Sequence, residues 1–81
     1  GYAKTTIIPQ GQDSIFIDWS NEFSPQTTPT VLATLRSADE NDPIIAYRIE
    51  GAVSLAGVRF VFSSKTPSNN FALEVAAFII D

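Results

Sequence analysis

Cysteine and histidine are both absent from this chain of 81 residues. Without cysteine no disulfide can stabilise the fold, and without either residue the usual zinc ligands are missing. A Ser-His-Asp or Cys-His catalytic arrangement cannot be built either. We therefore expect no metal site of this kind, no cofactor and no enzyme activity.

Basic residues are also few, and they are scattered along the chain. Five lysines and arginines stand against nine acidic residues, which gives a formal net charge of -4. No basic stripe can follow a phosphate backbone, and an anionic membrane surface would repel the chain. No run approaches the roughly 20 apolar residues of a membrane span. The sequence thus argues against nucleic acid as a partner and against membrane insertion.

The small size of the chain limits how much apolar surface it can bury. A domain of this length forms one core and buries only about 60% of the surface of its unfolded chain. Since disulfides and Cys/His metal sites are excluded as further support, self-association remains. We therefore expect a homo-oligomer.

β-Branched and aromatic residues occur in short bursts, separated at fairly even spacing by turn residues. No stretch shows the periodicity of an amphipathic helix. The pattern predicts an all-β fold, an antiparallel β-sandwich of five or six strands. Residues 13–81 are expected to form this sandwich, whereas residues 1–12, with a short β-prone run at 5–8, are expected to form an N-terminal arm or linker.

The last predicted strand, residues 71–80, has too many apolar residues for a strand with one face in water. Its alternate positions form two faces: Phe71, Leu73, Val75, Ala77 and Ile79, and then Ala72, Glu74, Ala76, Phe78 and Ile80. A strand that is apolar on both faces needs a second surface to pack against. We therefore predict an oligomer interface that includes Phe71, Leu73, Glu74, Val75 and Phe78.

Glu74 is the one charged residue within this strand. A buried carboxylate without a partner is strongly unfavourable. We predict that Glu74 pairs with an arginine, with Arg48 or Arg59 preferred, either in the same chain or in a neighbouring one. The alternative is an exposed glutamate at a strand edge.

Trp19 follows a predicted strand and has hydrogen-bonding neighbours in Asp18 and Asn21. An exposed tryptophan could stack on a sugar ring while Asp18 or Asn21 binds its hydroxyl groups. The alternative, which we favour, is that Trp19 caps the core, because Ile15 and Ile17 share its face.

Tyr47 is a second candidate platform for a sugar, near a protomer boundary, and Arg48 is its charged neighbour. The alternative, again favoured, is burial of Tyr47 between Ile45 and Ile49. The acidic turn at 39–42 is interpreted as a solvated hairpin loop, because it has too few oxygen ligands for the six to eight that Ca²⁺ prefers.

Three segments, taken in order, resemble the H-type lectin domain. The first places Trp19, Phe23 and Pro29 before the apolar run Thr30–Leu35 and Asp39. The second, Val53-Ser54-Leu55-Ala56-Gly57-Val58, is similar to the family's Val-Thr/Ser-x-x-Gly-Phe turn. The third is the long last strand, in which Ala77-Phe78-Ile79 falls where the family has a tryptophan and an aliphatic residue. The resemblance covers roughly residues 13–80.

This resemblance implies a six-stranded antiparallel sandwich that assembles as a trimer. Family members bind N-acetylgalactosamine-type sugars between protomers, and similar domains occur at the tips of phage tail fibres. The family's sugar-binding arginine lies in the strand before the Val-Thr/Ser-x-x-Gly-Phe turn, and Arg48 is the only arginine in the corresponding strand here. Counting back from Gly57 without gaps places the family's position nearer Ile45, and counting forward from Pro29 places it nearer Tyr47. Lys65 and Thr66 fall where the family has an aromatic residue and a histidine.

From the resemblance we expect a trimeric attachment or receptor-binding knob of a viral fibre, located on a virion or outside the cell, with surface glycans as partners. The alternative is a structural module that trimerises or caps a fibre and binds no ligand. The missing sugar-site arginine and histidine favour this second hypothesis.

Overall fold

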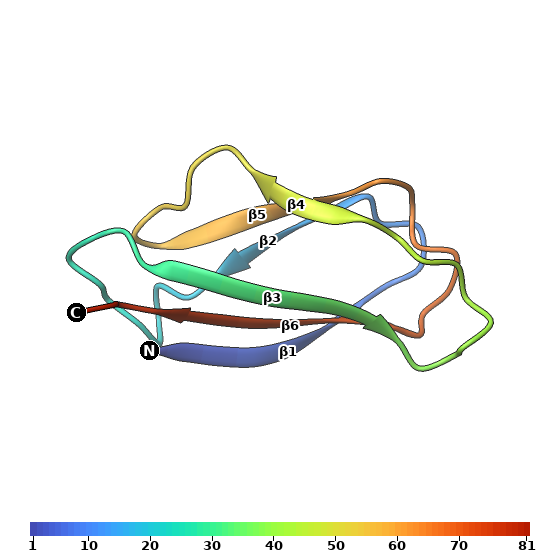
Figure 1. The fold of residues 1–81 in the computed structure, drawn as a ribbon, viewed down its shortest axis with the longest axis horizontal. Helices are drawn as coiled ribbons and strands as arrows, with labels where there is room; N and C mark the ends of the chain where they lie inside the picture. The colour runs from blue at the N-terminus through green and yellow to red at the C-terminus, as the bar shows by residue number, and fades with distance from the viewer.

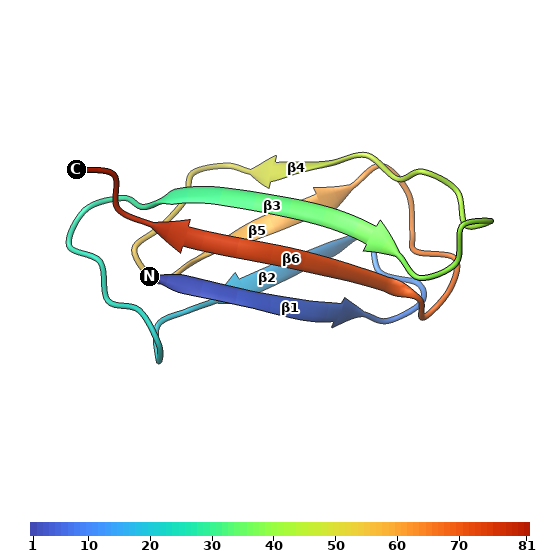
Figure 2. The same cartoon turned by 60° about the horizontal axis from the view of Figure 1, so that its bottom comes forward.

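The structure, a computed structural model, describes residues 1–81 as two antiparallel three-stranded sheets with no helix. The strands are β1 (Tyr2–Ile8), β2 (Ser14–Asp18), β3 (Thr30–Ser37), β4 (Tyr47–Glu50), β5 (Gly57–Phe62) and β6 (Phe71–Phe78). Their order is β1-β6-β3 in one sheet and β2-β5-β4 in the other. The two sheets face each other as layers along the long axis of the molecule (Figures 1 and 2). The predicted all-β, antiparallel architecture is therefore confirmed, in the form of a small sandwich.

The first residues of the chain belong to the sandwich and do not form a separate arm. β1 pairs with β6 along its whole length, from Tyr2 opposite Ala77 to Ile8 opposite Phe71. Tyr2 and Ile8 are both buried in the core. The prediction of an arm or linker over residues 1–12 was therefore wrong for this segment, because the second edge of β6 needs a strand partner for its backbone groups.

The core lies between the two sheets and consists of side chains from the inward positions of the strands, together with Trp19 after β2 and Ile45 before β4. Its twelve buried residues are Tyr2, Ile8, Ile17, Trp19, Ile45, Val58, Phe60, Phe62, Phe71, Leu73, Val75 and Ala77. Trp19 and Phe60 are the largest side chains that are fully buried. The period-2 alternation of the sequence thus predicts which face of each strand packs inward.

β6 is the central strand of its sheet, and its inward face fills the chain's own core. Phe71, Leu73 and Val75 are each at most 4% exposed. The prediction that these three residues form an oligomer interface was wrong, because the β2–β5–β4 sheet of the same chain already covers them. Glu74 and Phe78 occupy the opposite parity on β6, where Glu74 is exposed and Phe78 is half-buried.

The structure contains no helix that is long and apolar enough to cross a membrane.

Candidate functional site

Trp19 is fully buried, at 0% exposure, directly after β2. Its indole Nε1–H donates to the Leu55 carbonyl at 2.8 Å, so the one polar atom of the ring has a partner. The ring contacts Tyr2 and Phe23 in tilted arrangements, with centroids 5.9 and 6.2 Å away. The core alternative is confirmed, and the hypothesis that Trp19 stacks on a sugar was wrong.

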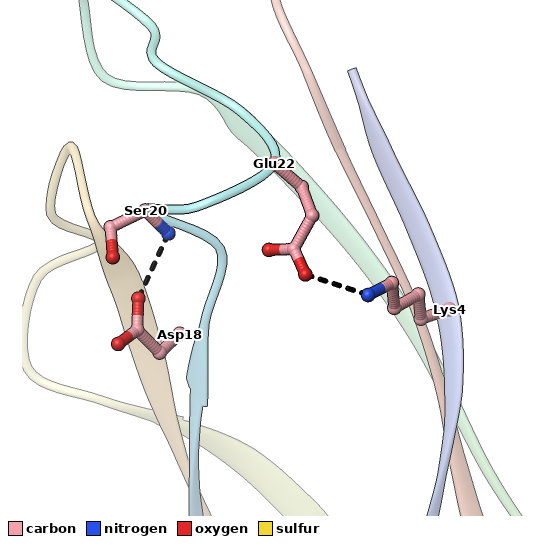
Figure 3. Close-up of polar contacts among 4 residues, drawn as sticks. All are labelled: Lys4, Asp18, Ser20 and Glu22. Atoms are coloured by element: carbon pink, nitrogen blue, oxygen red, sulfur yellow. Dashed lines mark hydrogen bonds and ion pairs between the residues drawn. The ribbon is translucent and has the colours of Figure 1, made fainter.

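The polar residues around Trp19 close the turn that follows β2. The Asp18 carboxylate accepts the Ser20 backbone N–H at 2.8 Å (Figure 3). Bonding from the Ser20 hydroxyl, and then from its N–H, lowers the pKa of Asp18. Asn21 lies exposed in the same turn. With Trp19 buried, Asp18 and Asn21 do not surround an aromatic platform.

The same turn is tied to the other sheet by an ion pair. Lys4 Nζ lies 2.7 Å from Glu22 Oε1 (Figure 3). The hydrogen bond and the charge of Glu22 raise the pKa of Lys4. Lys4 lies opposite the buried Val75, and therefore occupies an inward position of the edge strand β1. An inward charge at an edge discourages pairing with a further strand.

Tyr47 and Arg48 leave β4 on opposite faces, because they are adjacent residues of a strand. The Tyr47 hydroxyl donates to the Ala33 carbonyl of β3 at 2.8 Å, and its ring lies 6.5 Å from that of Phe60. Arg48 Nη1 donates only to the neighbouring Ile49 carbonyl, at 3.3 Å. The structure therefore does not bring Tyr47 and Arg48 together as a single sugar site.

Glu74 has an arginine partner, but not one of the two predicted. Its Oε1 accepts the Arg36 Nε–H at 2.9 Å, and both side chains are about half exposed. Glu74 lies opposite Thr34 on β3, so Arg36 is its diagonal neighbour. Arg48 and Arg59 lie on the other sheet. The preference for these two residues was therefore wrong, although an arginine partner is confirmed.

The outer side of the β1–β6–β3 sheet forms what we call the small-residue face. Its floor is made of short side chains on three neighbouring strands, and a hollow of about 690 Å³ lies over it. The residues that define it are Ala3, Thr5, Ile7, Leu32, Thr34, Arg36, Ala72, Glu74, Ala76 and Phe78. Ile7 and Leu32 are 65% and 59% exposed. The second apolar face of β6 lies beneath them, with Ala72 buried and Ala76 and Phe78 half-buried.

The outer side of the β2–β5–β4 sheet carries a different set of residues. Phe16 is 46% exposed and lies opposite Arg59, whose guanidinium carbon is 5.5 Å from the centre of its ring. Glu50 lies opposite Arg59 on the other side. These residues border a hollow of about 380 Å³ above Gly57, which we call the Phe16 hollow. The sequence signal for this hollow is Phe16, an aromatic residue that shares the otherwise polar face of β2 with Ser14 and Asp18.

The acidic turn between β3 and β4 holds loops together. Asp42 accepts the hydroxyls of Ser37 at 2.5 Å and Ser68 at 2.9 Å. The bond from Ser37 is the main cause that lowers the pKa of Asp42. The carboxylates of the turn are not gathered into a group that could hold a metal ion. Asp42 therefore serves to join the end of β3 to the loop before β6.

No family model, curated protein or solved structure matches this chain. The resemblance to the H-type lectin domain therefore rests on the sequence motifs alone.

Proposed function

We propose that this chain is a non-enzymatic attachment or receptor-binding knob that assembles as a homotrimer in a viral or other extracellular fibre. We further propose that its sandwich has the H-type lectin fold. The observation that carries the proposal is the small-residue face, where Ile7 and Leu32 lie exposed on the two strands that flank β6. The trimeric state, the fibre and the glycan partner come from the sequence resemblance.

The small-residue face suits a surface that a second copy covers. Exposed apolar surfaces of this kind are typical of protein interaction sites. Its short side chains, Ala3 and Ala76, allow a second chain to approach the sheet closely. Arg36 and Glu74 neutralise each other within the chain, so covering them leaves no isolated charge behind. A face that is apolar and electrically neutral supports self-assembly in preference to a strongly charged partner.

Two carboxylates of the chain, Asp18 and Asp42, support a non-enzymatic function. A general acid at neutral pH requires a raised pKa. Asp18 and Asp42 instead have lowered pKa values, because serine hydroxyls donate to them. Both are thus held in the ionised form as acceptors in turns.

A structural module without a ligand is the second candidate. It is favoured by the burial of Trp19 and by the separation of Tyr47 from Arg48. A glycan array probed with the assembled protein distinguishes the two functions. Binding to any surface glycan supports the attachment knob. A correctly assembled trimer that binds no glycan on the array overturns that function and leaves the structural module.

A further inference from the structure

We propose that the Phe16 hollow, on the outer side of the β2–β5–β4 sheet, binds a neutral saccharide. The inference rests on the attachment function proposed above, for which it identifies the contact surface and the ligand class. The hollow lies on the sheet opposite the small-residue face, so an assembly formed through that face leaves it accessible. It belongs to a single chain and needs no residue from a partner.

The aromatic platform of this site is held in a fixed position. A Cβ added to Gly57 would lie 2.8 Å from Phe16 Cζ and 2.3 Å from the Ile17 carbonyl oxygen. The Phe16 ring therefore extends across Gly57 and packs against its backbone, which only a residue without a side chain allows. Nearly half of the Phe16 surface remains exposed. A planar apolar surface held in this way can stack on the C–H face of a sugar ring.

Two charged groups beside the ring, Arg59 and Glu50, form no ion pair within the chain. Arg59 and Glu50 face each other across β5 and β4, yet neither belongs to the two ion pairs of the chain, Lys4–Glu22 and Arg36–Glu74. Asp18 also lies on this side, opposite Gly57, but its carboxylate is bonded to Ser20. Glu50 and Arg59, whose guanidinium carbon lies 5.5 Å from the centre of the Phe16 ring, are therefore the charged groups that can bind a ligand resting on Phe16.

The chemistry of these two groups selects the class of ligand. Arg59 can only donate hydrogen bonds and the Glu50 carboxylate can only accept them, whereas a hydroxyl group does both. Neighbouring hydroxyls of a sugar can satisfy the two residues together. An anionic ligand would meet Glu50, Asp18 and a net charge of -4, and a cationic ligand would meet Arg59. The hollow, at about 380 Å³, falls within the range of about 300–1,000 Å³ that is usual for small-molecule sites.

The test is a ¹H–¹⁵N NMR titration of the whole chain with free neutral hexoses and N-acetylhexosamines. We expect at least one of these sugars to shift the amide signals of Phe16, Gly57 and Arg59. Arg59→Ala should weaken that binding by about 10-fold or more, because a hydrogen bond to a charged group is lost. Phe16→Leu should also weaken it, since an apolar side chain remains but the flat ring does not.

Arg48→Ala is the matched control, because Arg48 occupies the same outer side in a different row of the sheet, opposite Val61. Its affinity should equal that of the parent. The dispersed spectrum of each variant reports that it is folded. Shifts confined to another part of the chain, or unaltered affinity in Arg59→Ala, overturn this site while a positive glycan array still supports the attachment function. Absence of shifts with every sugar in the panel overturns the site as well.

Discussion

The Tyr47 hydroxyl donates a hydrogen bond to the Ala33 carbonyl at 2.8 Å. Tyr47 lies on β4 and Ala33 on β3, which are edge strands of different sheets. The bond therefore joins the two sheets along one open side of the sandwich, where β3 and β4 run next to each other (Figure 2). A tyrosine that the sequence offered as a candidate sugar platform connects the two layers.

Tyr47→Phe should lower the free energy of unfolding by about 1 kcal/mol, because it removes this bond and leaves the ring in place. In a domain of this size the melting temperature should fall by about 4–8 °C per kcal/mol. Thermal unfolding followed by circular dichroism measures the change. Tyr2→Phe is the matched control, because the Tyr2 ring packs in the core but its hydroxyl makes no hydrogen bond within the chain. The free energy of unfolding of this variant should change by less than about 0.5 kcal/mol. An equal loss in both variants would contradict a bond between the sheets at Tyr47.

Trp19 is the only tryptophan, so its fluorescence reports on one place in the core. Because the ring is fully buried, we expect emission at short wavelength and little quenching by iodide until the chain unfolds. Trp19→Ala should cost about 3–5 kcal/mol of stability, since it leaves a large cavity and removes the bond to Leu55. Iodide quenching in the folded protein as strong as that of free tryptophan would show that the ring is exposed.

Gly57→Ala should destabilise the protein by about 1–3 kcal/mol, because the new methyl group collides with the Ile17 carbonyl and the Phe16 ring. The NMR signals of the Phe16 ring should move as well. Gly51→Ala is a useful comparison, because Gly51 has open space around it but a φ of +70°. Its cost arises from the backbone conformation alone, about 1–2 kcal/mol. If Gly57→Ala leaves the Phe16 ring signals unchanged, the ring does not pack against Gly57 as described.

Asp42 predicts an acid dependence of stability. Its pKa in the folded protein is lowered, chiefly by the Ser37 hydroxyl and then by Ser68. A depressed pKa contributes stability above the unfolded value of about 3.9, and this contribution is lost as the pH falls through the folded pKa. Asp42→Asn should therefore be less stable than the parent at neutral pH and less sensitive to pH below about 4.

Denaturant unfolding at a series of pH values measures this dependence. Ser37→Ala should also make stability less dependent on pH below about 4, though less so than Asp42→Asn, because it removes the strongest donor to the Asp42 carboxylate. A parent and an Asp42→Asn variant that lose stability in parallel below pH 4 would exclude Asp42 as the cause.

Alternation along the chain was sufficient to predict much of this fold. It placed Trp19 on the face of Ile15 and Ile17, and that face is the core. It also identified two apolar faces on residues 71–80. It could not predict which of them meets the chain's own second sheet, because both faces are mostly apolar and only the position of the β2–β5–β4 sheet distinguishes them.

The misses depend on contacts between strands that are distant in the sequence. The partner of Glu74 is Arg36, because β3 and not β4 or β5 lies beside β6, and strand order is not encoded in the period of a single strand. The first strand, β1, was only partly predicted, because the charged Lys4 interrupts the apolar residues on its inward face. An edge strand tolerates such an inward charge. Phe16 acquires its significance only from Arg59, which the register of β2 and β5 places opposite it.

Self-assembly through the small-residue face is tested most directly by the solution mass of the parent and of two matched variants. Leu32→Glu places a charge on that face, whereas Ile44→Glu places the same charge on an equally apolar residue that is fully exposed outside both sheets. Sedimentation equilibrium at micromolar concentration should give three times 8.8 kDa for the parent and for Ile44→Glu, and a folded monomer for Leu32→Glu. A parent that is monomeric, or a Leu32→Glu variant that assembles as the parent does, would contradict the account.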